Sequence, residues 1–257
     1  METIILGDGP MGWAIADGLR TAGLPARAPL GRPVEGPHPP LAFAGADVVF
    51  EASRGGAVAK NVEAGVAGGC RRFVIATTGW DRDRAGVDRL LRERRATAVT
   101  AANFSIGVAA FLRLVDEAVR LLGPLPEFDP YLVEWHRRSK ADRPSGTAKE
   151  LLRRVLAAHP RKRRLADPAV EGPPRDDELA LAVVRAGASP GMHLVGFDAP
   201  GETIELRVTA RDRSAYAAGA IAAGRWLVGG SPPPGIHQFD DVIADLLSAR
   251  APLAVPA

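Results

Sequence analysis

The sequence has a single cysteine, few aromatic residues and no long hydrophobic run. One cysteine, Cys70, excludes an intrachain disulfide and a cysteine-rich zinc site, so we interpret it as a small buried hydrophobic residue and expect no metal. No apolar stretch approaches the roughly 18 residues of a membrane span, and the first residues lack the basic and apolar segments of a secretory signal. These absences predict a protein of the reducing cytoplasm that makes no membrane contact.

The sequence also carries little net charge. Its 33 lysine and arginine residues and 30 aspartate and glutamate residues leave a formal net charge of +3, although the pI is near 9.4. The basic residues are mostly scattered arginines rather than a stripe, so we expect no nucleic-acid partner. The densest basic run, at residues 161–164, is interpreted as a solvated loop. A chain of 257 residues can bury a full core and divide into two domains.

A glycine pattern near the start of the chain predicts a dinucleotide site. An apolar run at residues 3–6 leads into Gly7-Asp8-Gly9-Pro10-Met11-Gly12, and a stretch with helical spacing follows. In such a turn the first glycine makes the tight bend, the second lets the backbone approach the pyrophosphate, and the third lets the helix pack on the strand. The alternative is a glycine-rich loop without a ligand.

Strand and helix patterns then alternate for about a hundred residues. This alternation predicts an α/β fold, with a parallel Rossmann-type sheet covered by helices on both faces. Ligands of such sheets bind at the carboxyl ends of the strands. Further strand ends are therefore candidate cofactor contacts, although each could be an ordinary turn: Ser53-Arg54, Thr77-Thr78-Gly79 and Ala102-Asn103-Phe104.

The pattern changes after residue 107. A long helix at 108–122 is followed by strand-like runs at 131–134, 179–185, 192–197 and 203–209, and by helices at 214–228 and 240–247. We therefore expect a second α+β domain with a mixed open sheet, and a chain that returns to the first domain. The predicted division is 1–106 with 215–257 for dinucleotide binding, and 107–214 for substrate binding.

One cationic segment suggests a site for a carboxylate. His136 and Lys140 lie four residues apart beside two arginines, and Pro-Ser-Gly-Thr then precedes a run with helical spacing. The free N–H groups of a new helix attract an anion. This arrangement indicates a small carboxylate substrate with a proton donor beside it. The alternative is an exposed basic turn.

The choice between NADPH and NADH depends on the segment after the first helix. An acidic residue about 20 positions past the glycine pattern binds the ribose 2′-hydroxyl of NAD, whereas an arginine accommodates the 2′-phosphate of NADP. Residues 24–34 contain no acidic residue, but both Arg27 and Arg32 are present. We favour Arg32, because it lies near the end of a poorly defined second strand. The sequence thus favours NADPH over NADH, unless both arginines are simply solvated.

Several strings resemble, in order and spacing, those of bacterial dihydrodipicolinate reductases. They are Gly7-Asp-Gly-Pro-Met-Gly12, Ala76-Thr-Thr-Gly79, Ala101-Ala-Asn-Phe-Ser-Ile-Gly-Val108, Glu134-x-His136-x-x-x-Lys140-x-Asp142-x-Pro-Ser-Gly-Thr-Ala148 and Arg185-x-Gly187. The resemblance spans nearly the whole chain, and the string from Lys140 to Ala148 is highly specific. It implies an NAD(P)H-dependent reductase of the diaminopimelate route to lysine, typically a homotetramer built through the second domain's sheet.

The resemblance also implies roles for individual residues. His136 falls on a proton donor or acceptor, and Lys140 on a lysine proton donor. Gly146 and Thr147 fall on residues that hold a carboxylate of the cyclic dicarboxylate 4-hydroxy-tetrahydrodipicolinate. The cofactor contacts fall on residues 7–12 and on Ala76, Thr77, Thr78, Ala101, Ala102, Asn103 and Phe104.

Three positions depart from the family pattern. Arg137 stands where the family usually has a second histidine that touches substrate, and we expect Arg137 to take over that contact. The alternative is that Arg137 points to solvent while Arg138 or another cation holds the carboxylate. Glu51-Ala52-Ser53 replaces a motif such as Asp-Phe-Thr, and Arg143 replaces the usual alanine. Two alternatives follow: a reductase of another small imine or keto acid, or a dinucleotide-binding homologue without catalysis.

Overall fold

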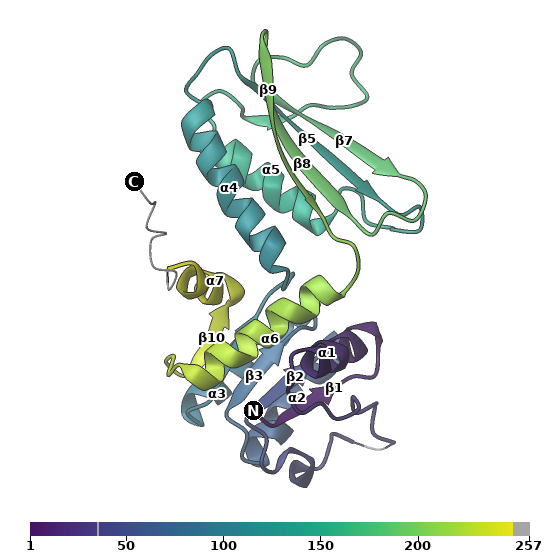
Figure 1. The fold of residues 1–257 in the computed structure, drawn as a ribbon, viewed down its shortest axis with the longest axis vertical. Coiled ribbons are helices and arrows are strands. Elements are labelled where there is room, and N and C mark those ends of the chain that lie inside the picture. The colour runs from purple at the N-terminus through teal and green to yellow at the C-terminus, as the bar shows by residue number, and fades with distance from the viewer. Residues whose placement is uncertain (35, 249–257) are drawn as a thin grey trace. The chain divides into compact units, whose positions relative to one another are not determined.

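The structure, a computed structural model, describes residues 1–34 and 36–248 and divides the chain into two compact units (Figure 1). The first unit comprises Met1–Ile106 and the segment that begins at Arg213, and the second comprises Gly107–Asp212. No helix among the described residues is both long and apolar enough to cross a bilayer.

The first unit is built on a five-stranded sheet whose neighbouring strands are all parallel. In spatial order its strands are β1 (Thr3–Leu6), β2 (Val48–Glu51), β3 (Arg72–Ile75), β4 (Thr97–Thr100) and β10 (Gly235–Gln238). Strands β1, β2 and β4 are buried along their whole length. Burial of both faces explains why these strands read as continuous apolar runs.

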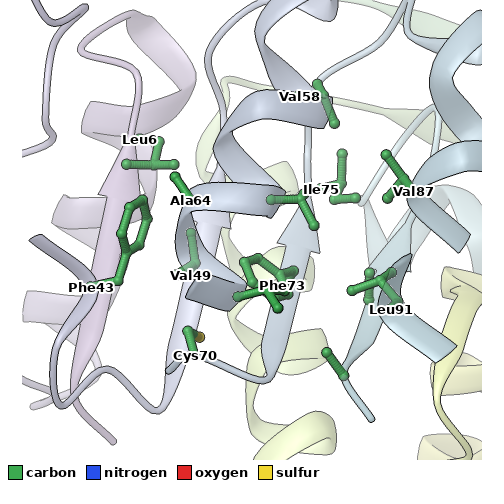
Figure 2. Close-up of a cluster of buried hydrophobic side chains, with 14 of the residues drawn as sticks. Leu6, Phe43, Val49, Val58, Ala64, Cys70, Phe73, Ile75, Val87 and Leu91 are labelled. Carbon is green, nitrogen blue, oxygen red and sulfur yellow. The ribbon is translucent and has the colours of Figure 1, made fainter. Parts of the chain in front are cut away.

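Helices cover both faces of this sheet. They are α1 (Pro10–Thr21), α2 (Val58–Ala67), α3 (Arg84–Glu93), α6 (Ser214–Gly229) and α7 (Phe239–Ser248), with short 3-10 turns η1 (Pro40–Phe43), η2 (Gly55–Ala57) and η3 (Asp81–Asp83). Figure 2 shows one face, where Val58 of α2 and Leu91 of α3 gather around Phe73 and Ile75 of β3. Cys70 lies buried in the same cluster, which confirms its interpretation as a small hydrophobic residue.

The first unit differs from the expected strand pattern at two places. The second strand is reduced to a single bridge between Leu6 and Leu30, as the poorly defined pattern there suggested. Strand β10 was not predicted, because Ile236 is its only strongly apolar residue and three prolines precede it. It forms because β4 offers a free edge, to which residues 235–238 add in parallel register.

The second unit is a mixed sheet with its helices on one side. The sheet order is β6 (Arg164–Leu165), β7 (Glu178–Arg185), β5 (Asp129–His136), β8 (Met192–Ala199) and β9 (Glu202–Thr209). Strand β5 pairs in parallel with β7 and antiparallel with β8, which confirms the expected mixed sheet. Helices α4 (Ile106–Leu122) and α5 (Gly146–Ala158) pack on one face (Figure 1).

The interpretation of residues 161–164 as a solvated loop was wrong. Lys162 is only 3% exposed, and its ammonium group lies 2.5 Å from Asp129. Arg161 donates to the Phe128 carbonyl at 2.8 Å, and Arg164 pairs with Asp177 at 3.1 Å. These contacts attach the basic run to the edge of the second unit. The sequence did not reveal them, because the partners come from segments distant in the sequence.

Candidate functional site

The glycine turn of the first unit has the shape that a diphosphate needs. Gly7 has φ +100, and a Cβ there would lie 2.4 Å from the Ala52 carbonyl oxygen. A Cβ on Gly12 would lie 1.8 Å from the Gly7 carbonyl oxygen, so both positions require glycine. A Cβ on Gly9 would meet nothing within 4 Å, and Gly9 caps α1 without a side-chain hydrogen bond. The N–H groups of the first helical turn therefore have open space in front of them, which suits an anion.

The end of β2 is organised by a buried carboxylate that the sequence did not reveal as important. Glu51 is fully buried, and its Oε1 accepts hydrogen bonds from Asn61 at 3.0 Å and from the Ser53 hydroxyl. Thr77, from the next strand end, donates to the Glu51 carbonyl at 3.3 Å. The departure at Glu51-Ala52-Ser53 thus forms an internal support for the loop, and Thr77 is 7% exposed beside it.

Of the residues after β4 that were predicted to contact the cofactor, two are accessible and two have side chains engaged within the protein. Ala102 is exposed and Ala101 is half-buried, so both are accessible at the strand end. Asn103 instead accepts the Ser105 N–H at 2.8 Å, in a turn that leads into α4. The Phe104 ring is 3% exposed and lies 4.9 Å from the ring of Phe239. The Phe104 side chain thus belongs to the core, which leaves only its backbone for a ligand.

Arg27 and Arg32 lie near opposite ends of β1. Arg27 is 3.7 Å from Glu2, at the amino end of the strand. Leu30 bridges to Leu6 and accepts the Gly7 N–H at 2.8 Å, so Arg32 follows at the carboxyl end. Arg32 makes no ion pair within residues 1–34 and 36–248. This placement supports the choice of Arg32, because ligands of parallel sheets bind at the carboxyl edge.

In the second unit, β5 ends at His136 rather than at residue 134. Glu134 is fully buried, and it accepts the Ser145 N–H at 3.1 Å and an Arg185 N–H at 2.7 Å. The Nδ1 atom of His136 lies 3.5 Å from the Glu134 carboxylate. His193, opposite Glu134 on β8, presents its ring to His136 at 5.1 Å in an edge-to-face arrangement. The family strings contained Glu134 and Arg185 but gave them no role, and sequence reasoning missed His193, because only the sheet brings the three together.

These neighbours shift the pKa values of the cluster. Burial lowers the pKa of His136, and Lys140 and Arg185 add to this effect, while the Glu134 carboxylate opposes it. Burial, together with His136, lowers the pKa of His193 to about 4. Burial alone raises the pKa of Glu134, but the contacts with Ser145 and Arg185 outweigh it, so the net pKa lies below the ordinary value. The cluster therefore holds an ionised carboxylate and two neutral imidazoles at neutral pH.

The cationic loop after β5 is held by hydrogen bonds to backbone carbonyl groups of β7 and of the turn that follows β7. The Arg138 N–H donates to the Gly187 carbonyl at 3.1 Å, and Arg143 donates to the Val183 carbonyl at 3.1 Å. Lys140 pairs with Asp142 at 2.7 Å, and its side chain is 23% exposed. Arg137 is exposed and makes no ion pair or side-chain hydrogen bond within the described part of the chain. Its guanidinium group is therefore available to a ligand.

The loop ends at the predicted helix N-terminus. Helix α5 begins at Gly146, and the hydroxyl group of Ser145 caps it by accepting the Ala148 N–H at 3.2 Å. The N–H groups of Gly146 and Thr147 have no acceptor within the helix. A Cβ on Gly146 would meet nothing within 4 Å. Glu134 thus links His136 to Ser145, the residue before this open helix N-terminus, and Lys140 lies between the two in the sequence.

Comparisons with known proteins agree with this arrangement. A family model described as "Dihydrodipicolinate reductase, C-terminus" matches residues 107–243. The 4-hydroxy-tetrahydrodipicolinate reductase of Methanoculleus marisnigri is 36% identical over 197 residues, which are 77% of this chain and 75% of that protein. That of Methanospirillum hungatei is 35% identical over 200 residues, with the same coverage. The chain belongs to the 4-hydroxy-tetrahydrodipicolinate reductase family.

Solved structures support the fold of this reductase family member. A dipicolinate-bound dihydrodipicolinate reductase from Paenisporosarcina sp. TG-14 matches with TM-score 0.69 and 18% identity, over 93% of this chain and 97% of that one. GenD2 from gentamicin A biosynthesis, in complex with NAD, matches with TM-score 0.51 and 14% identity, over 96% and 91%. Membership of the reductase family makes the protein an oxidoreductase that uses a nicotinamide cofactor.

Proposed function

We propose that this protein uses NADPH to reduce 4-hydroxy-tetrahydrodipicolinate in the diaminopimelate route to lysine. The observation that carries this proposal is the segment from His136 to Thr147, where Glu134 links a buried imidazole to the residue before an open helix N-terminus, and where the Lys140 ammonium group acts on that imidazole. The substrate loses water to give a conjugated imine, a hydride adds to a ring carbon, and a proton completes the reduction. Such a reaction needs a dianion site and a positioned acid.

The first unit would hold the cofactor. An added Cβ on Gly9, at the N-terminus of α1, would meet nothing within 4 Å, which supports placing the pyrophosphate there. Ala76, Thr78, Ala101 and Ala102 supply strand ends at the same edge of the sheet. Arg32, which has no carboxylate partner in the described chain, would bind the 2′-phosphate and favour NADPH over NADH. The nicotinamide supplies the hydride when it is bound.

The two substrate carboxylates would be held by the segment that follows β5. The N–H groups of Gly146 and Thr147, with the Thr147 hydroxyl group, offer donors to one carboxylate. Arg137 is exposed and makes no ion pair among the described residues, and it would form a charged contact with the substrate in place of the family's histidine. A guanidinium group is planar and permanently charged, so it can hold a carboxylate through two hydrogen bonds. Arg143 is engaged with the backbone of β7 instead.

Proton transfer would be carried out by His136 and Lys140. Lys140 is paired with Asp142 in the structure, and a dianionic substrate can compete for its ammonium group. His136 is 7% exposed, and it is neutral at neutral pH because burial lowers its pKa. A neutral imidazole beside a carboxylate can take up a proton and pass it on, which is the requirement for an acid–base group.

The open face of the second unit's sheet would form the subunit interface of a homotetramer. Trp135 and Val184 lie on neighbouring strands in register and are 39% and 41% exposed, although both are large and apolar. Val133 and Ala182 continue the same face, which no helix of the second unit covers in the described residues (Figure 1). Light scattering after gel filtration would test this proposal, and a monomeric mass would contradict it.

The proposed activity is tested by following NADPH oxidation with freshly generated 4-hydroxy-tetrahydrodipicolinate. We expect turnover with this substrate, and rescue of a bacterial strain that cannot make diaminopimelate. A rescue that fails with the Lys140→Ala variant would tie growth to the site. Turnover only with another small imine or keto acid would contradict the proposed substrate, and no turnover with any of them would favour a non-catalytic homologue.

A further inference from the structure

The buried carboxylate of Glu134 contacts three separate parts of the second unit. Its Oε1 accepts the Arg185 guanidinium group from β7 at 2.7 Å, and both oxygens accept the Ser145 N–H, at 3.1 and 3.2 Å. Its Oε2 faces Nδ1 of His136 at 3.5 Å. Ser145 directly precedes the helix N-terminus at Gly146. One carboxylate thus links the imidazole to the backbone that leads into the anion site.

The Nδ1 atom of His136 is buried and has no hydrogen-bond partner in the described part of the chain. Glu134 Oε2 faces it, and closing the gap to a hydrogen bond requires a shift of roughly half an ångström. The other ring nitrogen, Nε2, lies beside Gly191, where an added Cβ would approach within 3.0 Å. Gly191 therefore leaves the space next to Nε2 free of a side chain.

We propose that Glu134 is a positioning residue for His136: its carboxylate holds the proton on Nδ1 and leaves Nε2 to exchange a proton with the substrate. The inference rests on the proposed function, in which His136 takes part in protonation. A carboxylate can only accept a hydrogen bond, so it stabilises the Nδ1–H tautomer. When the imidazole becomes charged, the same carboxylate stabilises the imidazolium, as an oriented acid does for histidine in other enzymes.

Several other groups surround His136. Lys140 from the loop and Arg185 from β7 favour its neutral form, Asp142 from the loop favours its charged form, and the His193 ring from β8 lies against it. Lys140 and Arg185 each lower the pKa of His136, and Glu134 is the strongest group that raises it. His193 is neutral at neutral pH, since its own pKa is lowered to about 4 by burial. Removing the Glu134 charge therefore leaves His136 without its main counter-charge.

The same geometry also has a second interpretation, as a metal site. Ligand atoms of Glu134, His136 and His193 all lie within 4.8 Å of one another. A divalent cation there would add two positive charges next to Arg185, which already neutralises Glu134 at 2.7 Å. A second cation, Lys140, also acts on the histidines. The local charge therefore opposes a metal, and the arrangement favours the carboxylate–histidine pair.

Nitrogen NMR of the full-length protein, labelled at its histidines, tests the pair without relying on activity. Assignment comes from His136→Gln and His193→Gln variants. We expect the Nδ1–H tautomer of His136 in the wild type. In Glu134→Gln, the amide oxygen would accept from Arg185 and the amide N–H₂ would face Nδ1, so we expect the Nε2–H tautomer and a His136 pKa lower by about one unit or more. The matched control is Glu150→Gln, which removes a carboxylate that pairs with Arg153 and Arg154.

Kinetics supply the second measurement. In Glu134→Gln, the falling limb of the profile of kcat/KM against pH should move down by the same amount as the His136 pKa, and kcat near pH 7 should fall about tenfold or more. Glu134→Asp keeps the negative charge, so its pH profile and its kcat should lie between those of the wild type and those of Glu134→Gln. A merely structural role for Glu134 would lower thermal stability but would leave the tautomer and the pH profile unchanged.

Each outcome decides between the alternatives. An Nε2–H tautomer in the wild type, or an unchanged His136 pKa in Glu134→Gln, overturns the inference. If Glu134→Gln does not fold, the wild-type tautomer and Glu134→Asp still decide. Stoichiometric zinc binding that Glu134→Gln abolishes, with turnover that a chelator removes, would establish the metal site instead. Wild-type turnover in His136→Gln, together with the Nδ1–H tautomer of His136 in the wild-type protein, would refute the catalytic role of His136 while preserving the pair.

Discussion

Arg185 holds Glu134 from the neighbouring parallel strand, with 2.7 Å between Nη2 and Oε1, and donates from the same nitrogen to the Asp142 carbonyl at 2.6 Å. The guanidinium group thus connects the buried carboxylate with the cationic loop. Gly187, two residues further on, adopts φ +60 and offers its carbonyl to the Arg138 N–H. The Arg185-x-Gly187 string therefore holds the loop in place, with one residue neutralising Glu134 and the other forming the turn.

Removal of the Lys140 ammonium group should reduce turnover far more than cofactor binding. We expect Lys140→Ala to lower kcat by about 10²–10⁴-fold, because the ammonium group both holds negative charge and delivers a proton. His136→Ala should behave similarly. Steady-state kinetics and a titration with NADPH separate the two effects. Lys149→Ala, on the exposed face of α5, is the control. Wild-type rates in Lys140→Ala would contradict the assignment.

Arg137 should determine substrate affinity rather than the rate of the chemical step. Arg137→Ala should raise KM about 30-fold or more if its charge pair with the substrate is desolvated, which corresponds to roughly 2 kcal/mol of lost binding free energy. Arg137→His should recover part of this binding near pH 6 and less near pH 8, since a histidine is charged only at the lower pH. Arg138→Ala is the matched comparison. An unchanged KM in Arg137→Ala with a raised KM in Arg138→Ala would reassign the contact.

Arg32 should decide the preference for NADPH. Arg32→Ala should weaken NADPH binding by about tenfold or more and leave NADH binding nearly unchanged, because only NADPH carries the 2′-phosphate. Isothermal titration with both cofactors measures this difference. Arg27→Ala is the control, since Arg27 pairs with Glu2 at the opposite end of β1. Tighter binding of NADH than of NADPH by the wild type would refute the assignment.

His193 should make the protein less stable in mild acid. Burial lowers its pKa from 6.5 to about 4, so between these values the unfolded chain binds a proton that the folded protein does not. The free energy of unfolding should therefore fall as the pH drops through this window, by up to about 2 kcal/mol between pH 7 and pH 5. Carboxylates change the free energy of unfolding at lower pH than His193 does. Arg153 and Arg154, for example, lower the pKa of Glu150 to about 2.

Urea unfolding of the wild type and of His193→Gln at pH 7 and pH 5 measures this effect. The variant should lose most of the difference between the two pH values, whatever its stability at pH 7. His237→Gln, which changes a partly exposed histidine of the first unit, is the control and should retain the difference. An unchanged pH dependence in His193→Gln would show that another group is responsible.

The sequence alone determined the features that depend on local order along the chain. The glycine turn, the helix that begins at Gly146 and the buried state of Cys70 follow from the spacing of glycine, of capping residues and of apolar residues. The alternation of strands and helices similarly indicated a parallel sheet followed by a mixed one. These features are encoded locally, because backbone conformation and amphipathic faces depend on residues a few positions apart.

Only the tertiary structure decided which distant residues meet. Glu134, Arg185 and His193 lie on three strands, and their contacts depend on the register of the sheet. The same is true of Phe104, whose ring turns into the core against Phe239, and of Lys162, which is buried beside Asp129. The sequence favoured Arg32 over Arg27 only from a poorly defined strand pattern, whereas the bridge between Leu30 and Leu6 places the two arginines near opposite ends of β1. A burial pattern shows that a side chain is enclosed, whereas its partner depends on how separate strands align.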